Sequence, residues 1–167
     1  GLFTLSSCTA PTNVKDYSAY VNPFIGTGGH GHTFPGAVVP HGMIQPSPDT
    51  RIDGWDACSG YYYADSTING FSHTHVSGTG CCDYGDVLLM PTVGKQQYRT
   101  TDPQSQRLAY ASSFSHKNEI AEPGYYSVFL DTYQVKAEIS STKRGAIHRY
   151  TFPENTESGF SIDLDYS

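Results

Sequence analysis

The chain has 167 residues, of which 16% are charged and 13% aromatic, and its formal net charge is -6. This length suffices for one domain with a core of its own. The acidic balance argues against a nucleic-acid partner, and no apolar run approaches the roughly 20 residues that a membrane-spanning helix needs. Val, Ile, Thr, Tyr and Phe are common while helix formers are scarce, so an all-β fold is expected.

Residues 1–17 are predicted to be the tail of a truncated lipoprotein signal and a polar tether. Leu5, Ser6, Ser7 and Cys8 form a lipobox pattern, in which a bacterial signal peptidase cuts before the cysteine and the thiol carries lipid. The protein is therefore expected to be exported and lipid-anchored in the bacterial cell envelope, at the outer-membrane surface or in the periplasm. The alternative is a frayed terminus with a chance cysteine.

Three further cysteines are Cys58, Cys81 and Cys82. Export would permit a disulfide from Cys58 to either of its two possible partners, and the spacing does not choose between them. The sequence has no CxxC pair, which argues against a structural zinc site.

Residues 18–167 are predicted to form an antiparallel β-sandwich. Strand signals start near Tyr20, flank a turn at residues 40–42 and include a buried run within 85–93. The clearest strands cover residues 125–130, 135–140, 146–152 and 160–166. Turn signals separate them at residues 122–124, 143–145 and 153–155. No convincing amphipathic helix of about ten residues is present.

In the last predicted strand, apolar and polar residues alternate, which places one set on the core face and the other toward solvent. The apolar set is Phe160, Ile162, Leu164 and Tyr166. No closing turn follows this strand, so the sequence is expected to stop inside a longer protein and to leave a sheet edge open.

Residues 22–36 place five glycines and two histidines in one loop, in a spacing that fits neither a dinucleotide fingerprint nor a P-loop. His30 and His32 alternate, as do His73 and His75, and two imidazoles on one face of a strand suit a metal. Neither pair has an aspartate or glutamate beside it in sequence. Hydrogen bonds to backbone or sugar hydroxyls are therefore favoured, and no metal site is predicted.

Trp55 is the only tryptophan and lies in a polar segment bracketed by glycines, residues 53–60. Sugars stack their CH-rich faces on aromatic rings and need polar neighbours for their hydroxyls, which this segment supplies. The alternative is a tryptophan that plugs the core. Residues 61–63 are three tyrosines that would alternate across a strand. Serines and histidines at 72–77 do not form the GxSxG elbow of a serine hydrolase.

Glycosidases usually need two carboxyl groups, one as general acid and one as base or nucleophile. The candidate carboxylates are Asp49, Asp53, Asp56, Asp65, Asp83, Asp86, Glu119 and Glu122. None of them combines an apolar setting with a partner, so no acid/base pair is predicted in this chain.

Several motifs together resemble the N-terminal domain of the calcium-dependent α-mannosidases of glycoside hydrolase family 92. The resemblance runs from about Val21 to the end of the chain. The motifs are Asn22–Ala37, Pro40–Met43, Cys58–Tyr61, Gly70–His75, Ser77–Gly80, Gly85–Pro91, Pro123–Tyr126 and His148–Pro153. Cys82 stands where a glycine is expected in the family pattern, and His41 where an aromatic residue is expected.

The resemblance implies a β-sandwich of the galactose-mutarotase-like type that is followed by a catalytic (α/α)6 domain absent from this chain. It also implies an exo-acting, inverting α-mannosidase that hydrolyses terminal α-mannosides of glycans such as N-glycans or yeast mannan. Calcium would bind mannose hydroxyls, mostly through residues outside this chain. The acid and base would come from the C-terminal domain, so this chain alone is expected to be inactive.

The substrate-binding residues implied by the resemblance are Gly28, Gly29, Trp55, Cys58, His73 and His75. Trp55 would stack on the leaving sugar, and Cys58 would be a buried thiol near the mannose, which argues against its disulfide. Two alternatives remain from other classes. One is a stand-alone carbohydrate-binding module, and the other is a structural domain in which the Gly/His segments only make turns.

Overall fold

The computed structural model describes residues 15–166 except 83, 99, 103, 105, 106, 155 and 156. The predicted lipidation site, Cys8, lies outside the described residues. Regular structure in the described part consists of strands and two 3-10 turns, η1 (Ser18–Tyr20) and η2 (Trp55–Ala57). The strands are β1 (Ser47–Asp49), β2 (Thr67–Ile68), β3 (Gly70–Ser72), β4 (Leu88–Val93), β5 (Thr101–Asp102), β6 (Arg107–Leu108), β7 (Ser112–Glu122), β8 (Tyr125–Leu130), β9 (Val135–Ser141), β10 (Ala146–Thr151) and β11 (Ser158–Asp163). None of the described helices is long and apolar enough to cross a membrane.

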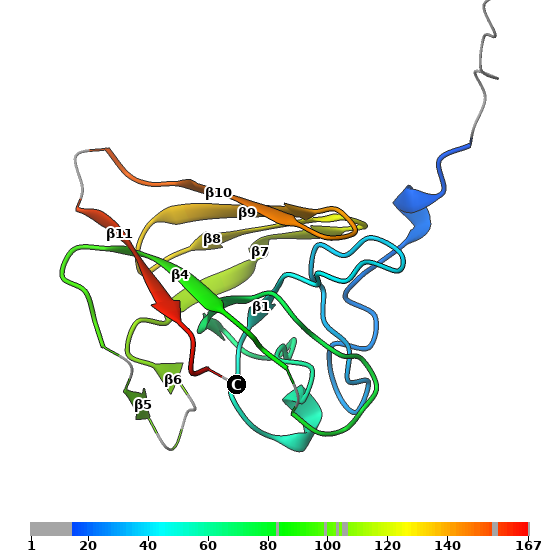
Figure 1. Cartoon of the computed structure of the whole chain (residues 1–167), viewed down its shortest axis with the longest axis horizontal. Coiled ribbons are helices and arrows are strands. Elements are labelled where there is room, and N and C mark those ends of the chain that lie inside the picture. Colours follow the sequence, from blue (N-terminus) through cyan, green and yellow to red (C-terminus); the bar gives the residue numbers. More distant parts are fainter. Residues whose placement is uncertain are drawn as a thin grey trace, which may run out of the picture.

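Two antiparallel sheets pack face to face and form a β-sandwich (Figure 1). One sheet has the strand order β1-β3-β4-β11 and the other β10-β9-β8-β7-β2, while β5 and β6 form a separate pair. The second sheet is a meander in which β7, β8, β9 and β10 follow each other in sequence. Tight turns explain this order, because Gly124 takes a positive φ of 75° between β7 and β8. The predicted all-β sandwich is confirmed.

The core lies between the two sheets and is filled from both sides. Phe71 and Met90 come from the first sheet, and Tyr126, Val128 and Ile139 come from the second. All five are at most 1% exposed, and the rings of Phe71 and Tyr126 lie 6.4 Å apart. Burial of each such side chain stabilises the fold by roughly 1.5–3 kcal/mol.

One charged residue, Glu119 on β7, is buried within this framework and receives three donors. The hydroxyl of Tyr126 donates to its carboxylate at 2.6 Å, and that of Tyr61 at 3.1 Å. Nδ1 of His116 lies 2.6 Å from the same carboxylate. Burial and then the charge of Glu119 raise the pKa of Tyr61 and of Tyr126, so both remain neutral donors. The carboxylate thereby connects β7 and β8 with the loop that contains Tyr61.

The strands predicted at 125–130, 135–140 and 146–152 are confirmed, and the buried run at 85–93 contains β4. Alternation in β10 is also as expected, because His148 and Tyr150 are half-buried while Arg149 is exposed. The segments near Tyr20 and around the turn at 40–42 contain no strand in the described structure. Tyr20 ends η1 instead, because three residues with a local turn suffice for a 3-10 helix.

The predicted burial of the apolar face of the last strand is wrong. Phe160, Ile162 and Leu164 are exposed by 49%, 62% and 77%, whereas Asp163 is only 9% exposed. Phe160 still points to the ring of Tyr150, with centroids 5.3 Å apart, so this apolar face belongs to the side of the core. It remains exposed because β11 and β10 are both edge strands, and in the described residues no further strand covers that margin.

Candidate functional site

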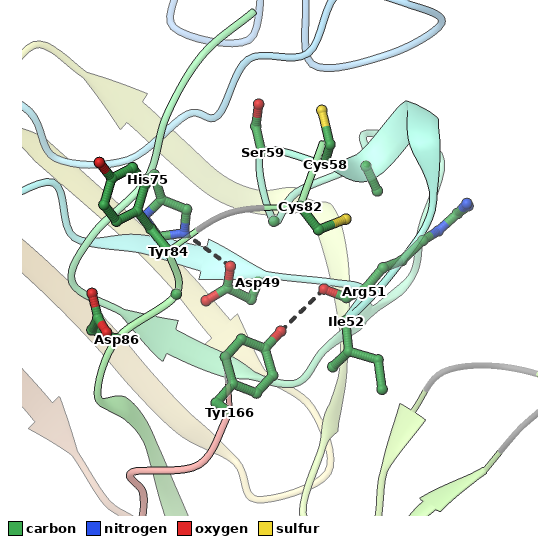
Figure 2. A pocket seen from close by; sticks show the side chains of 13 residues that line it. Asp49, Arg51, Ile52, Cys58, Ser59, His75, Cys82, Tyr84, Asp86 and Tyr166 are labelled. Atoms are coloured by element: carbon green, nitrogen blue, oxygen red, sulfur yellow. Dashed lines mark hydrogen bonds and ion pairs between the residues drawn. The ribbon is translucent and has the colours of Figure 1, made fainter. Parts of the chain in front are cut away.

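The loops at one end of the sandwich enclose an open recess of about 500 Å³ (Figure 2). Its walls come from segments far apart in sequence: the end of β1, the turn around η2, the segment after β3, and the C-terminal residues after β11. The lining residues are Asp49, Arg51, Ile52, Ala57, Cys58, Ser59, Gly60, His75, Cys82, Tyr84, Gly85, Asp86 and Tyr166. The recess is mixed in polarity, as a site for a polyhydroxylated ligand must be.

A buried ion pair forms the inner wall of the recess. Nε2 of His75 lies 2.9 Å from Oδ1 of Asp49, and the two side chains are 3% and 1% exposed. Nδ1 of His75 lies 2.7 Å from the carbonyl of Gln45, which can only accept. Burial by itself lowers the pKa of His75, but the charge and hydrogen bond of Asp49 together with the Gln45 carbonyl outweigh it, so the pKa is raised. We therefore describe His75 as an imidazolium that donates from both nitrogens.

Ser72, His75 and Asp49 do not form a nucleophilic triad, although they are in contact. Ser72 Oγ lies 3.1 Å from Nε2 of His75, the same nitrogen that faces Asp49. A triad requires the serine and the carboxylate on opposite ring nitrogens, and here Gln45 occupies the other one. Ser72 is also fully buried. Its role is structural, since its backbone N–H donates to Oδ2 of Asp49 at 3.1 Å.

Gly60 allows the wall to approach this ion pair. Its φ is +86°, and a Cβ at this position would meet Oδ1 of Asp49 and lie 3.1 Å from the ring of His75. Only glycine satisfies both the left-handed backbone and the lack of space. Within the motif of residues 58–61, the glycine at position 60 is therefore required by the lack of space beside the ion pair.

Three loops meet at Ser59. Its Oγ lies 2.7 Å from the carbonyl of His32 and 2.9 Å from that of Val76, and the N–H of Gly78 also donates to the His32 carbonyl at 2.7 Å. The glycine-rich loop, the turn around η2 and the segment after β3 are therefore held in a fixed arrangement. Sequence proximity gives no sign of this contact, because Ser59 and His32 are 27 residues apart.

The cysteines near the recess are free thiols. Cys58 is buried, whereas Cys81 and Cys82 are exposed, so neither of the disulfides considered from the sequence is present. Burial, followed by the charges of Asp53 and Cys58, raises the pKa of Cys82. Its thiol therefore remains protonated and is a weak nucleophile.

The outer wall combines a cation with aromatic groups. Arg51 makes a bidentate pair with Asp65 at 2.8 and 2.7 Å and lies over the ring of Tyr62, 4.6 Å from its centroid. The hydroxyl of Tyr166 donates to the backbone carbonyl of Arg51 at 3.0 Å. Tyr166, which the sequence places on the core face, packs against the core and also lines the recess (Figure 2).

The structure brings two of the six expected substrate-binding residues, Cys58 and His75, into the lining of the recess. Trp55 begins η2 and is 62% exposed, so it is a loop residue as the sequence indicates and does not plug the core. The Trp55 ring meets that of His32 edge-on, with the two centroids 4.8 Å apart. The six-membered ring of its indole lies against Gly80.

Like Trp55, the other three expected residues do not line the recess. Gly28 and Gly29 are exposed in the glycine-rich loop, where Gly29 takes a φ of +57°. His73 follows β3, and its Nε2 lies 3.1 Å from Nε2 of His148. Burial and then the charge of His73 lower the pKa of His148 to about 4, so the His148 ring is neutral at neutral pH.

Two expectations from the sequence differ from the structure, one about the histidine pairs and one about the three consecutive tyrosines. The sequence places no carboxylate beside either histidine pair, but the fold places Asp56 beside His30 and Asp49 beside His75. The tyrosines at 61–63 are not in a strand of the described structure; Tyr61 is buried and Tyr63 is exposed. Of the recess residues, Arg51, Tyr84 and Tyr166 were not identified as site residues from the sequence, because no local motif marks them.

Comparisons with known proteins agree with this fold. The family model of the glycosyl hydrolase family 92 N-terminal domain matches residues 20–167. A family 92 α-mannosidase from Bacteroides thetaiotaomicron, solved in complex with mannoimidazole, is 44% identical, with a TM-score of 0.81 over 89% of this chain and 20% of its own. An inverting family 92 mannosidase from the same bacterium is 32% identical, with a TM-score of 0.74 over 90% of this chain and 20% of its own.

An uncharacterized secreted glycosidase from Arthroderma benhamiae is 32% identical over 143 residues, which are 84% of this chain and 18% of that protein. The chain therefore belongs to glycosyl hydrolase family 92 and forms its N-terminal domain. It spans about one fifth of the length of the relatives that it matches.

Proposed function

We propose that this domain supplies a sugar-binding wall of an exo-acting, inverting α-mannosidase that removes terminal α-mannosides from glycans such as N-glycans or yeast mannan. The observation that carries the proposal is the open recess beside exposed Trp55, in a chain whose family includes α-mannosidases. Hydroxyl and thiol groups on its walls suit sugar hydroxyls, and Trp55 offers a face for a second sugar ring.

The catalytic acid and base are proposed to come from a C-terminal (α/α)6 domain that completes the site. Among the described residues, two carboxylates line the recess. Asp49 is 1% exposed and is held by His75 and Ser72, so it cannot reach a glycosidic oxygen. Asp86 accepts from Thr74 Oγ1 at 2.7 Å in an exposed turn, whereas the carboxyl group of a general acid usually lies in an apolar pocket.

Calcium is proposed to bind mainly through residues of that second domain. Calcium prefers six to eight oxygen ligands. Within the described residues, the group with suitable spacing for a metal is His30, His32 and Asp56, which offers two nitrogens and one carboxylate. This donor set does not fit calcium, so no step of the reaction is assigned to calcium through this chain.

The proposed activity is tested on the full-length protein that contains this chain. Its products from an α-linked mannobiose, followed by proton NMR from the first seconds, are expected to appear as β-mannose before mutarotation. The melting temperature of the 167-residue chain should not respond to mannose or calcium, whereas that of the longer protein should, since a ligand at about 100 times its dissociation constant adds about 2.7 kcal/mol. A response of the short chain to mannose alone would instead support a stand-alone binding module.

Trp55→Ala should lower kcat/KM for an α-mannobiose by about 10- to 100-fold, because an indole covered by a sugar ring contributes roughly 1.5–3 kcal/mol. Trp55→Phe should retain part of the activity. Tyr98, which is 88% exposed and does not line the recess, provides the control, and Tyr98→Ala should leave kcat/KM unchanged. Equal kcat/KM for Trp55→Ala and wild type would show that the indole does not contact the substrate.

We also propose that the protein is exported and attached to the cell envelope through a lipid on Cys8. A secreted relative and the lipobox at residues 5–8 support this placement. In cells that express the full-length precursor, Cys8→Ala should move the protein from the membrane fraction to the soluble fraction and abolish incorporation of labelled palmitate. Palmitate incorporation that persists in this variant would contradict the assignment.

A further inference from the structure

A group of three potential metal ligands lies outside the recess lining, where the glycine-rich loop meets η2. His30, His32 and Asp56 each offer one ligand atom, and these atoms lie within 4.8 Å of one another. Nδ1 of His30 and Oδ1 of Asp56 are already 2.5 Å apart. The group therefore joins two segments separated by more than twenty residues and is assembled only by the fold.

His32 provides an independent sign of a missing ligand. Its side chain is buried, with 7% of the residue exposed, yet no hydrogen-bond partner meets its Nε2 within the described part of the chain. A buried polar atom without a partner costs about 1–3 kcal/mol, and an imidazole in this state retains its capacity to bind a cation.

The three ligands differ in mobility in a way that suits metal capture. The backbone of His32 is fixed, because its carbonyl accepts from Ser59 Oγ and from the N–H of Gly78, both at 2.7 Å. The side chain of His30 is 81% exposed and that of Asp56 is 37% exposed. Small rotations of these two side chains can therefore adjust the donor atoms around one fixed imidazole.

The donor types identify the class of ion. Two imidazole nitrogens and one carboxylate suit zinc and related divalent transition metals, whereas calcium and magnesium prefer oxygen. Zinc binds these ligands at about 2.0–2.2 Å in a tetrahedron, so donor atoms about 3.3 Å apart are required. The three donor atoms lie within 4.8 Å of one another, so rotation of the two exposed side chains would have to bring them to this spacing. Three protein ligands leave the fourth position for water or a substrate oxygen.

We propose that His30, His32 and Asp56 bind a divalent transition metal of the zinc class beside Trp55. This site is separate from the calcium requirement in the proposed function and does not depend on it. The edge of the His32 ring contacts Trp55 at 4.8 Å between centroids, so the metal would also fix the position of the indole.

Titration with cobalt, followed by visible absorption, tests the site on the 167-residue protein after treatment with a chelator. One cobalt ion per chain is expected to give the ligand-field bands of a four- or five-coordinate site, and zinc should displace it. His30→Ala and His32→Ala should each weaken cobalt binding by about 100-fold or more, because even the loss of a residue that only supports a ligand costs about 10- to 100-fold. Asp56→Asn should also weaken it.

The controls separate this site from other donors. His41 is exposed and is not a member of the group, so His41→Ala should bind cobalt like the wild type. The side chain of His30 is largely exposed, so His30→Ala should fold even if His32→Ala does not. Strong thiolate-to-cobalt absorption in the near ultraviolet would instead assign the metal to the cysteines. The proposal would be overturned by this thiolate absorption, by unchanged cobalt binding in His30→Ala, or by displacement of cobalt with excess calcium. The absence of saturable binding at millimolar cobalt would overturn it as well.

Discussion

Replacing Asp49 by alanine should lower the free energy of unfolding by about 3–5 kcal/mol, the usual loss when one member of a buried ion pair is removed. The variant leaves His75 buried without its counter-ion and removes the acceptor for the Ser72 N–H. Urea unfolding followed by circular dichroism measures the change. Asp131→Ala provides a control at a half-exposed aspartate, where a change within about 0.5 kcal/mol is expected.

The same ion pair has a pH dependence of known sign. The pKa of His75 in the folded protein is raised above its ordinary value of 6.5, so its stabilising contribution is fully present below pH 6.5 and is lost as the pH rises through the folded pKa. The difference in unfolding free energy between wild type and Asp49→Ala should therefore narrow on the alkaline side of that window. A difference that is independent of pH would contradict the description of His75 as a cation.

Replacing Glu119 by alanine should lower the free energy of unfolding by about 4 kcal/mol. Two tyrosine hydroxyls in the core, those of Tyr61 and Tyr126, lose their acceptor, and each unsatisfied buried group costs about 1–3 kcal/mol. The loss of the His116 contact adds to this cost. Chemical unfolding at neutral pH gives the value, and Glu122→Ala, at an exposed position on the same strand, should have little effect.

A double-mutant cycle distinguishes the lost acceptor from a simple cavity. With Tyr61→Phe and Tyr126→Phe already present, no hydroxyl of these residues requires the carboxylate. Glu119→Ala should then cost much less than it does in the wild-type background. Equal losses in both backgrounds would mean that packing, and not the hydrogen bonds, accounts for the effect.

The strands could be predicted where local pattern and local pairing agree. In β10, half-buried His148 and Tyr150 alternate with exposed Arg149, because this strand pairs with β9 through a short turn. In β11 the same kind of pattern gave the wrong exposure. Alternation identifies which residues share a face, but whether that face is covered depends on which neighbouring strands exist. Phe160 and Ile162 share a face on an edge strand, so they remain exposed.

The site could be predicted only in part, for a related reason. Glycines, histidines and Trp55 stand out in sequence, and the family resemblance identified the correct domain. The partners that define their chemistry are distant: Asp49 is 26 residues from His75, and Asp56 is 26 residues from His30. The absence of a nearby carboxylate in sequence therefore did not exclude one in space, and recess residues such as Tyr166 had no local signal.

The edge of the sandwich where β10 of one sheet faces β11 of the other determines where the fold should open locally. These two edge strands belong to different sheets, and ring contacts connect them. The ring of Phe160 lies 5.3 Å from that of Tyr150 in a tilted arrangement, and 5.7 Å edge-on from that of Phe152, which follows β10. Ring contacts can separate without breaking a ladder of backbone hydrogen bonds, so this margin should open at a lower free energy than the seam of β7, β8 and β9. Amide protons on the free edges of β10 and β11 should then exchange with solvent first. The two sheets should therefore separate from each other along this edge before the β7–β9 ladder opens.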